Sequence, residues 1–279
     1  MADTQNEVYG QAYSHNIMQL AQEKYSKMLN TVYVKPNVRG KTFFQDQIGQ
    51  WEMEVKGSRN TQTPNNDPTL SRRMGIMVDY HDNRLLDRGD ELKCISDPRS
   101  AYTIAASQAL ARRVDDSIVD AIRGTAYTGE TGTSTAPTAT TVSASASSMT
   151  LTKILEVKKE LDDNDVEMED RFFVVNPTVM NSLLDVTEIG SSDYNSVKAL
   201  VRGEMDTFLG FKWVTSTRVN ASDIGYAYQK YGICAAMGAA PMVRTDERSD
   251  LSYSWQVYYE LNMGAVRLEE SRIVRIIEG

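Results

Sequence analysis

One stretch of the chain constrains the fold more than any other: residues 97–124, DPRSAYTIAASQALARRVDDSIVDAIRG. Asp97 can accept hydrogen bonds from the first free backbone N–H groups of a helix, Pro98 suits the first helical position, and Gly124 predicts a left-handed stop. We therefore expect one helix between these ends, roughly 39 Å long at 1.5 Å per residue. A helix of that length matches the width of a small domain, so the elements packed along it should identify the fold.

The apolar residues of this helix recur at spacings of three, four and seven, which predicts one buried stripe. The stripe consists of Ala101, Ile104, Ala105, Ala111, Val114, Ile118, Val119 and Ile122. The opposite face is charged, at Arg112, Arg113, Asp115, Asp116, Asp120 and Arg123. A charged helix face is usually solvated, so we expect it at the surface, with contact to a neighbouring chain as the specific alternative.

Residues 1–40 are expected to form an arm outside the core. The segment 14–30, SHNIMQLAQEKYSKMLN, places its apolar side chains on one helical face, and the extended segment 32–38, VYVKPNV, follows it. A helix tethered outside a domain either docks on a neighbouring surface or packs on its own chain. The sequence leaves both possibilities open.

From residue 41 to residue 95 the apolar period changes to two, which predicts a two-stranded ribbon. In 51–55, WEMEV, apolar residues alternate with glutamates, and in 73–80, RMGIMVDY, the alternating set is Met74, Ile76, Val78 and Tyr80. We expect these segments to be the arms of one hairpin, joined by the polar residues 56–71. Because two strands cannot build a core, the ribbon needs another surface, either in the main sheet or on another subunit.

The second half of the chain mixes helices and strands. Residues 124–150 are nearly all Gly, Ser, Thr and Ala and are expected to form a flexible excursion. A helix over 151–163 and a buried strand over 171–175 follow, and Gly210 predicts a bulge or tight bend in a later strand. The last third is strand-rich, and its final apolar group at 273–277 should join a sheet. The fold class is therefore α+β.

Composition and charge exclude several classes of protein. The chain has 30 basic and 38 acidic residues, a net charge of −8, which argues against a dedicated nucleic-acid-binding module and leaves only non-specific contact with DNA. No apolar stretch reaches membrane-spanning length, and the amino terminus lacks the layout of a signal peptide, so we expect a protein made in a cytoplasm.

The sequence contains no constellation of catalytic or metal-binding residues. The dinucleotide fingerprint, the phosphate loop and the nucleophile elbow are absent, and His15 and His81, the only histidines, have no paired metal-ligand spacing. His81 is expected in an exposed YHDN turn. Cys94 and Cys234 are far apart and predict reduced thiols. We therefore expect no enzyme activity, no cofactor and no metal site.

The order of parts carries the strongest indication: arm, ribbon, long helix, excursion, α/β unit and a strand-rich return. This order resembles the major capsid protein of tailed bacteriophages, which has the Hong Kong 97 fold. Two phrases agree with it, RFFVVNPTVMNSLLD at 171–185 and ALVRGEMDTFLGFKWVTSTRV at 199–219. The resemblance implies the following domains: an N-arm over 1–40, an extended loop over 41–95, a peripheral domain over 96–149, an axial domain over 150–245, and a return to the peripheral domain over 246–279.

The function implied by this resemblance is self-assembly. Copies of the chain would form pentamers and hexamers that close into an icosahedral shell around phage DNA, in the virion, after synthesis in the bacterial cytoplasm. Scaffolding, portal and decoration proteins are further implied partners. Two alternatives remain open from the sequence: a shell protein of an encapsulin-like compartment, and a cytoplasmic α/β enzyme or ligand-binding protein with domains 1–123 and 151–279.

The same resemblance places the candidates for contacts between subunits on the ribbon and on the charged face of the long helix. Some relatives crosslink through a lysine of the extended loop, and Lys56 lies at the expected ribbon tip. The candidates are Trp51, Lys56, Arg59, Arg72, Arg73, Arg112, Arg113, Asp115 and Asp116.

Overall fold

The computed structural model describes residues 23–60, 62–63, 65–87, 98–144, 149–183, 207–219, 222–238 and 241–278. They fall into two compact units. The smaller unit comprises the described parts of Met1–Tyr25, Asp79–Ala111 and Ala240–Leu261; the larger comprises those of Ser26–Val78, Arg112–Ala239 and Asn262–Gly279. Two domains over 1–123 and 151–279, joined by a hinge at 124–150, would each be one continuous stretch of the chain. Neither unit is continuous in this way.

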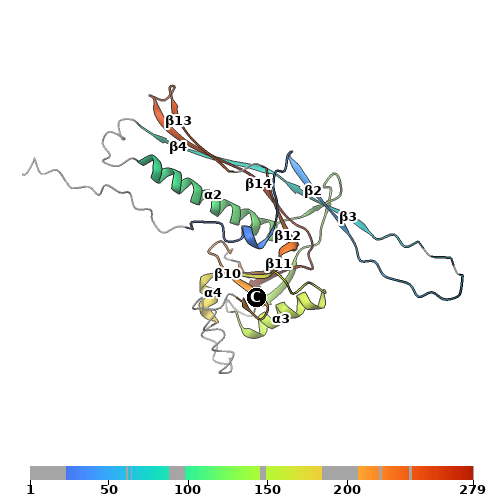
Figure 1. Cartoon of the computed structure of the whole chain (residues 1–279). Coiled ribbons are helices and arrows are strands. Elements are labelled where there is room, and N and C mark those ends of the chain that lie inside the picture. Colours follow the sequence, from blue (N-terminus) through green and yellow to red (C-terminus); the bar gives the residue numbers. More distant parts are fainter. Residues whose placement is uncertain are drawn as a thin grey trace, which may run out of the picture. The chain divides into compact units, whose positions relative to one another are not determined.

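The long helix is confirmed as α2, Pro98–Arg123 (Figure 1). The predicted stripe is buried in its second half, from Val114 to Ile122, but Ile104 is 46% exposed while Ala106 and Leu110 are buried. In the first half of the helix, alanines lie on several sides. The spacing of apolar residues there is therefore compatible with more than one buried face.

The predicted left-handed stop at Gly124 is wrong, because Gly124 is not among the described residues with positive φ. Its N–H donates to the Asp120 carbonyl at 2.7 Å, and a Cβ at this position would lie 2.7 Å from the same oxygen. Glycine is needed here for a close approach between backbone groups.

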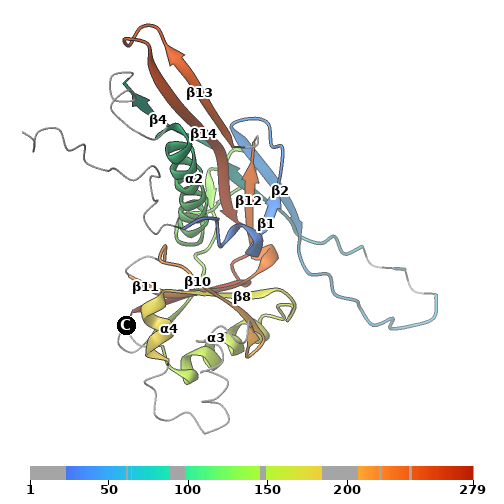
Figure 2. The same cartoon turned by 60° about the vertical axis from the view of Figure 1, so that its left-hand side comes forward.

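The main core of the larger unit lies on a six-stranded sheet in the order β7-β15-β11-β8-β10-β9. Its strands are β7 (Thr140–Ala144), β15 (Ile273–Glu278), β11 (Asp223–Gln229), β8 (Arg171–Val175), β10 (Phe211–Thr215) and β9 (Thr207–Phe208). Helix α3 (Leu151–Asp163) packs on this sheet through Ile154, Val157 and Leu161, and the short helix α4 (Pro177–Ser182) follows β8 (Figures 1 and 2). The predicted helix, buried strand and carboxyl-terminal strand are therefore confirmed.

The predicted tight bend at Gly210 is also confirmed. Leu209 and Gly210 have φ values of 54° and 87° and form the two-residue turn between β9 and β10. Such turns require positive φ, which glycine adopts without steric cost.

The ribbon exists, but its first arm differs from the prediction. β2 (Thr42–Ile48) pairs antiparallel with β3 (Leu70–Ile76), in register from Thr42↔Ile76 to Ile48↔Leu70. The segment 51–55 forms no strand and lies in the connection between them. Its alternating pattern describes an amphipathic segment, which still needs a partner strand to form a ladder.

The excursion after α2 is not structureless over its described part. β5 (Tyr127–Thr128) pairs with β3 and with β6 (Ser134–Thr135), and β7 pairs parallel with β15. Residues 124–144 therefore supply strands to two sheets. Their small polar residues are compatible with strands because the neighbouring elements provide the apolar contacts.

The five remaining strands of the described residues form a further sheet. In the larger unit, β1 (Tyr33–Lys35) pairs parallel with β12 (Ile233–Met237), which pairs antiparallel with residues 263–267 of β14 (Ser254–Arg267). In the smaller unit, β13 (Met242–Arg248) pairs with residues 254–260 of β14. β4 (Val78–Leu86) also pairs with β14, so His81 lies within a strand and the predicted YHDN turn is wrong.

The predicted helix over 14–30 lies mostly outside the described residues, and its described part is not α-helical. Residues 23–28 form no helix, and Leu29–Thr31 is a short 3-10 turn. The N–H groups of Lys27 and Met28, which a helix would use internally, donate to the Asp115 carboxylate instead. Separately, no helix within the described ranges is long and apolar enough to cross a membrane.

Candidate assembly surfaces

The tip of the ribbon is an exposed loop. The Gly49 N–H donates to the Thr69 carbonyl at 2.7 Å, and beyond this pair the described residues form no strand (Figure 1). Trp51, Met53 and Val55 are 72%, 98% and 95% exposed. A concentration of exposed apolar side chains on one loop is typical of a surface that another protein covers. The candidates Lys56 and Arg59 are exposed on the same loop.

The outward face of the ribbon combines apolar and ionic cross-strand pairs. Ile48 and Leu70, directly opposite each other, are 74% and 76% exposed. The next pair on this face joins Arg72 Nε to Asp46 Oδ1 at 2.5 Å. The hydrogen bond from Arg72 lowers the pKa of Asp46 below its usual value. The tip and this face line hollows of about 600 and 660 Å³.

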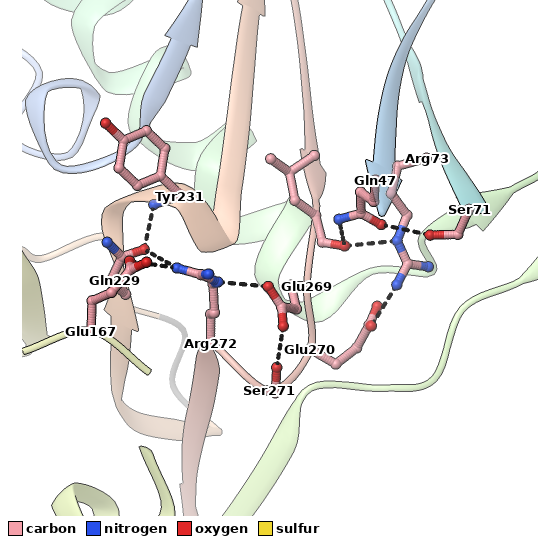
Figure 3. A network of polar contacts seen from close by, with 11 residues as sticks. Gln47, Ser71, Arg73, Glu167, Gln229, Tyr231, Glu269, Glu270, Ser271 and Arg272 are labelled. Carbon is pink, nitrogen blue, oxygen red and sulfur yellow. Dashed lines mark hydrogen bonds and ion pairs between the residues drawn. The ribbon is translucent and has the colours of Figure 1, made fainter. Parts of the chain in front are cut away.

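The opposite face of the ribbon contacts the body of the larger unit. Arg73 is buried and donates from Nε to the Leu268 carbonyl at 2.8 Å, while its Nη2 lies 2.5 Å from Glu270 Oε2 (Figure 3). Gln47 Nε2 donates to the same carbonyl at 2.7 Å and its Oε1 accepts from Ser71. The adjacent arginines of β3 thus point to opposite faces, Arg72 into solvent and Arg73 into the body.

The connection between β14 and β15, residues 268–272, binds the six-stranded sheet as well as the ribbon; we call it the 268–272 turn. Arg272 lies 2.6 Å from Glu269 and 2.9 Å from Glu167, and it donates to Gln229 at 3.1 Å (Figure 3). Gln229 ends β11, so the turn connects the ribbon base to the central strands through side-chain contacts.

The charged face of α2 is only partly solvated. Asp115 has 0% exposure, and its carboxylate accepts hydrogen bonds from Ser26 Oγ at 2.5 Å and from the N–H groups of Lys27 and Met28 at 3.1 Å each. The expectation of a solvated Asp115 is therefore wrong, because its partners lie almost ninety positions earlier in the chain. Asp116 is 3.7 Å from Arg218, and Arg112 and Arg113 are half-buried.

Two further buried ionic groups close the carboxyl end of α2. Asp223 binds Arg123, Arg275 and Tyr226 at 2.9, 2.8 and 2.6 Å. Arg267, 1% exposed, donates to the carbonyls of Ile122, Gly124 and Pro137 at 2.8, 2.6 and 3.2 Å, and burial lowers its pKa. Neither group was predicted from the sequence, where the available signal was a charge inside an apolar strand, as in Ala-Val-Arg-Leu at 265–268.

Within the part of the chain that the structure describes, no group of three or more His, Cys, Asp or Glu side chains could hold a metal ion. His81 lies against the Tyr258 ring, with 6.5 Å between ring centroids, and is exposed. Burial raises the pKa of the Cys234 thiol to about 11, which suppresses its reactivity. His15 and Cys94 lie outside the described residues.

Comparison with known proteins identifies the architecture. The structure is similar to the capsid structure of cyanophage P-SCSP1u, with a TM-score of 0.79 and 16% identity over 98% of this chain and 94% of that one. It is also similar to the structure from Mycobacterium phage Che8, with a TM-score of 0.75 and 17% identity over 97% of each chain. A third similar structure is the capsid of a native GTA particle, with a TM-score of 0.76 and 10% identity over 100% of this chain and 98% of that one.

The fold is therefore the α+β, Hong Kong 97-like capsid fold that the order of parts predicted. A comparison with curated protein sequences finds no match. A profile described as phage capsid protein matches residues 6–277. The chain belongs to the phage capsid protein family.

Proposed function

We propose that this chain is the major capsid protein of a phage, which assembles as pentamers and hexamers into an icosahedral shell around DNA. One observation carries the proposal: a long ribbon exposes its apolar residues at the tip, where no described part of the chain covers them. A subunit that exposes such a surface needs a second copy to bury it. The proposal includes no enzymatic activity.

Shell formation would follow from many weak contacts. Each ribbon and each N-arm would overlap a neighbour, and the contacts would add through multivalency in a closed lattice. We assign 1–40 to the N-arm, 41–95 to the extended loop, 96–149 to the peripheral domain with 246–279 returning to it, and 150–245 to the axial domain. A net charge of −8 suits a shell wall that does not bind the packaged DNA tightly.

The candidate contacts differ in their support. Trp51, Lys56 and Arg59 are exposed on the tip and Arg72 on the outward face of the ribbon, and we propose that these four meet a neighbouring subunit. Arg112, Arg113 and Asp116 stay proposed contacts on α2. Scaffolding, portal and decoration proteins are proposed partners, and the virion is the proposed location after synthesis in the host cytoplasm.

The test replaces the apolar residues of the tip by serine at Trp51, Met53 and Val55 together. We expect the variant to keep its thermal unfolding midpoint and to lose closed shells, seen by negative-stain microscopy and sedimentation. The matched control is Met168→Ser, which is 69% exposed in the loop after α3 and should assemble normally. Normal shells from the triple variant would contradict the proposal, as would a wild-type chain that stays monomeric in every assembly buffer.

A further inference from the structure

The ribbon is held in different ways at its base and at its tip. At the base, one side chain from each strand binds the same acceptor, because Gln47 of β2 and Arg73 of β3 both donate to the Leu268 carbonyl. Two paired strands that are bound to one fixed point cannot tilt independently about it. The direction in which the ribbon leaves the body is thereby determined at its base.

Arg73 also makes the ion pair of the base. Its side chain and that of Glu270 are 9% and 15% exposed, whereas those of Arg72 and Asp46 are 45% and 69% exposed. Removing one partner of a buried pair leaves an uncompensated charge, while an exposed pair contributes little. Of the two ion pairs, the inward one therefore resists movement of the ribbon more strongly.

The 268–272 turn is itself anchored to the rest of the larger unit. The Leu268 N–H donates to the Gly232 carbonyl at 2.8 Å, and the Gln229 N–H donates to the Arg272 carbonyl at 3.1 Å. The Arg272 side chain adds its contacts to Glu167 and Gln229 (Figure 3). The base of the ribbon is therefore connected rigidly to the six-stranded sheet.

Beyond Gly49 and Thr69 this support ends. A Cβ at Gly49 would lie 2.2 Å from Thr69 Oγ1, so the two segments that lead into the tip approach each other closely there. The described residues of 50–68 form no strand. A side-chain hydrogen bond from Asn66 to Glu54, at 2.8 Å, spans the tip. The tip can thus change its path while the base stays in place.

We infer that Arg73 is the residue that positions the ribbon, by fixing its base to the 268–272 turn, and that adjustment to differently placed neighbours is confined to residues 49–69. This inference rests on the proposed function, since it assigns a direction to the contact between subunits. Arg73 acts through Leu268 and Glu270 and is a positioning residue.

The first measurement is hydrogen–deuterium exchange on unassembled subunits of Arg73→Met. Exchange in 42–48 and 70–76 is expected to rise about tenfold, because the strands lose their main contact with the turn, while exchange in α3 stays unchanged. Arg72→Met, one residue away on the solvent side, is the matched control and should leave all three segments unchanged. Unchanged exchange at the base in Arg73→Met overturns the inference.

The second measurement is assembly. Arg73→Met should form shells of mixed diameter or open sheets, whereas the control Met168→Ser, outside the ribbon, should form shells as uniform as those of the wild type. If Arg73→Met raises exchange at the base but forms shells as uniform as those of the wild type, the positioning role is overturned. If Arg73→Met raises exchange throughout the chain, Gln47→Leu replaces it, since that variant removes one donor from the Leu268 carbonyl. A rise limited to the base then supports the inference, and no change overturns it.

The two proposals can fail separately. A wild-type chain that never assembles contradicts the shell function, but the exchange measurement on subunits still reports whether Arg73 holds the base. If the wild type forms uniform shells and exchange at the base of Arg73→Met is the same as in the wild type, only the positioning role is contradicted.

Discussion

The ribbon tip and the six-stranded sheet use the same kind of residue in opposite ways. Trp213 in the sheet stacks on Phe173, with 4.3 Å between ring centroids, and its Nε1 donates to the Phe208 carbonyl. Trp51 at the tip is 72% exposed. Apolar surface in the sheet stabilises the subunit, whereas apolar surface at the tip is available to stabilise contacts between subunits. Stability and assembly should therefore be separable by mutation.

The largest effect is expected in the sheet. Phe173→Ala removes a fully buried ring that touches both Phe211 and Trp213, and should lower the free energy of unfolding by about 3–5 kcal/mol. Trp51→Ala, measured by the same urea titration, should change it by less than about 0.5 kcal/mol. Equal losses in the two variants would contradict the separation of roles.

Thiol reactivity provides the next comparison. At pH 8 the Cys234 thiol, with its pKa raised to about 11, should react roughly 100-fold more slowly with iodoacetamide than an unperturbed thiol. A cysteine introduced by Val55→Cys at the 95% exposed tip position is the reference, followed by peptide mass spectrometry. The folded thiol keeps its proton to higher pH than the unfolded one, so stability should fall as the pH rises between about 9 and 11. Similar labelling rates at the two positions would show that Cys234 is accessible.

A smaller effect is expected where residues 26–28 bind Asp115 of α2. Asp115→Asn keeps the shape of the side chain but weakens its hydrogen bonds to Ser26, Lys27 and Met28, and should cost roughly 1–2 kcal/mol in unfolding free energy. Limited proteolysis should then cleave near residues 23–28 faster, with α3 still protected. Asp116→Asn, on the half-exposed neighbouring position, serves as the control. Unchanged cleavage would mean that Asp115 does not hold residues 23–28 in place.

The smallest effect is expected at the exposed ion pair of the ribbon. The pKa of Asp46 is lowered by Arg72, so the pair stabilises the fold above the unfolded carboxyl pKa and loses this contribution as the pH falls through the folded value. Because both groups are solvated, Asp46→Asn should leave the urea midpoint at pH 7 and at pH 3 close to that of the wild type. A clear shift of the urea midpoint in Asp46→Asn at pH 7 that disappears at pH 3 would show that the pair of Asp46 and Arg72 contributes more than expected.

Much of the fold could be predicted because local patterns were sufficient. Periodicity determined α2, α3 and the buried strand β8, and the order of parts led to the fold family. Alternation in β3 also implies that Arg72 and Arg73 point to opposite faces, but it does not reveal which face is covered. The first arm of the ribbon was misplaced because 51–55 alternates as a strand does, although no strand among the described residues pairs with it.

The candidate contacts were harder to predict because burial of a charge depends on distant partners. Asp115 is buried by residues 26–28, and Arg73 by the 268–272 turn, nearly 200 positions later. Sequence spacing cannot report such partners, so a charged helix or strand position is assigned to solvent by default. Lys56 was predicted at the ribbon tip and is exposed there, whereas Trp51, Met53 and Val55 were predicted in the first strand of the ribbon and lie in the exposed tip instead.

The carbonyls at the end of α2 bind Arg267, which follows them by more than 140 residues. During translation the helix leaves the ribosome long before its capping residue is made. The carboxyl end of the helix cannot acquire these hydrogen bonds until β14 has been synthesised and folded back. The hydrogen bonds that end α2 therefore depend on a strand made much later, and a chain that stops before β14 would leave these carbonyls without Arg267.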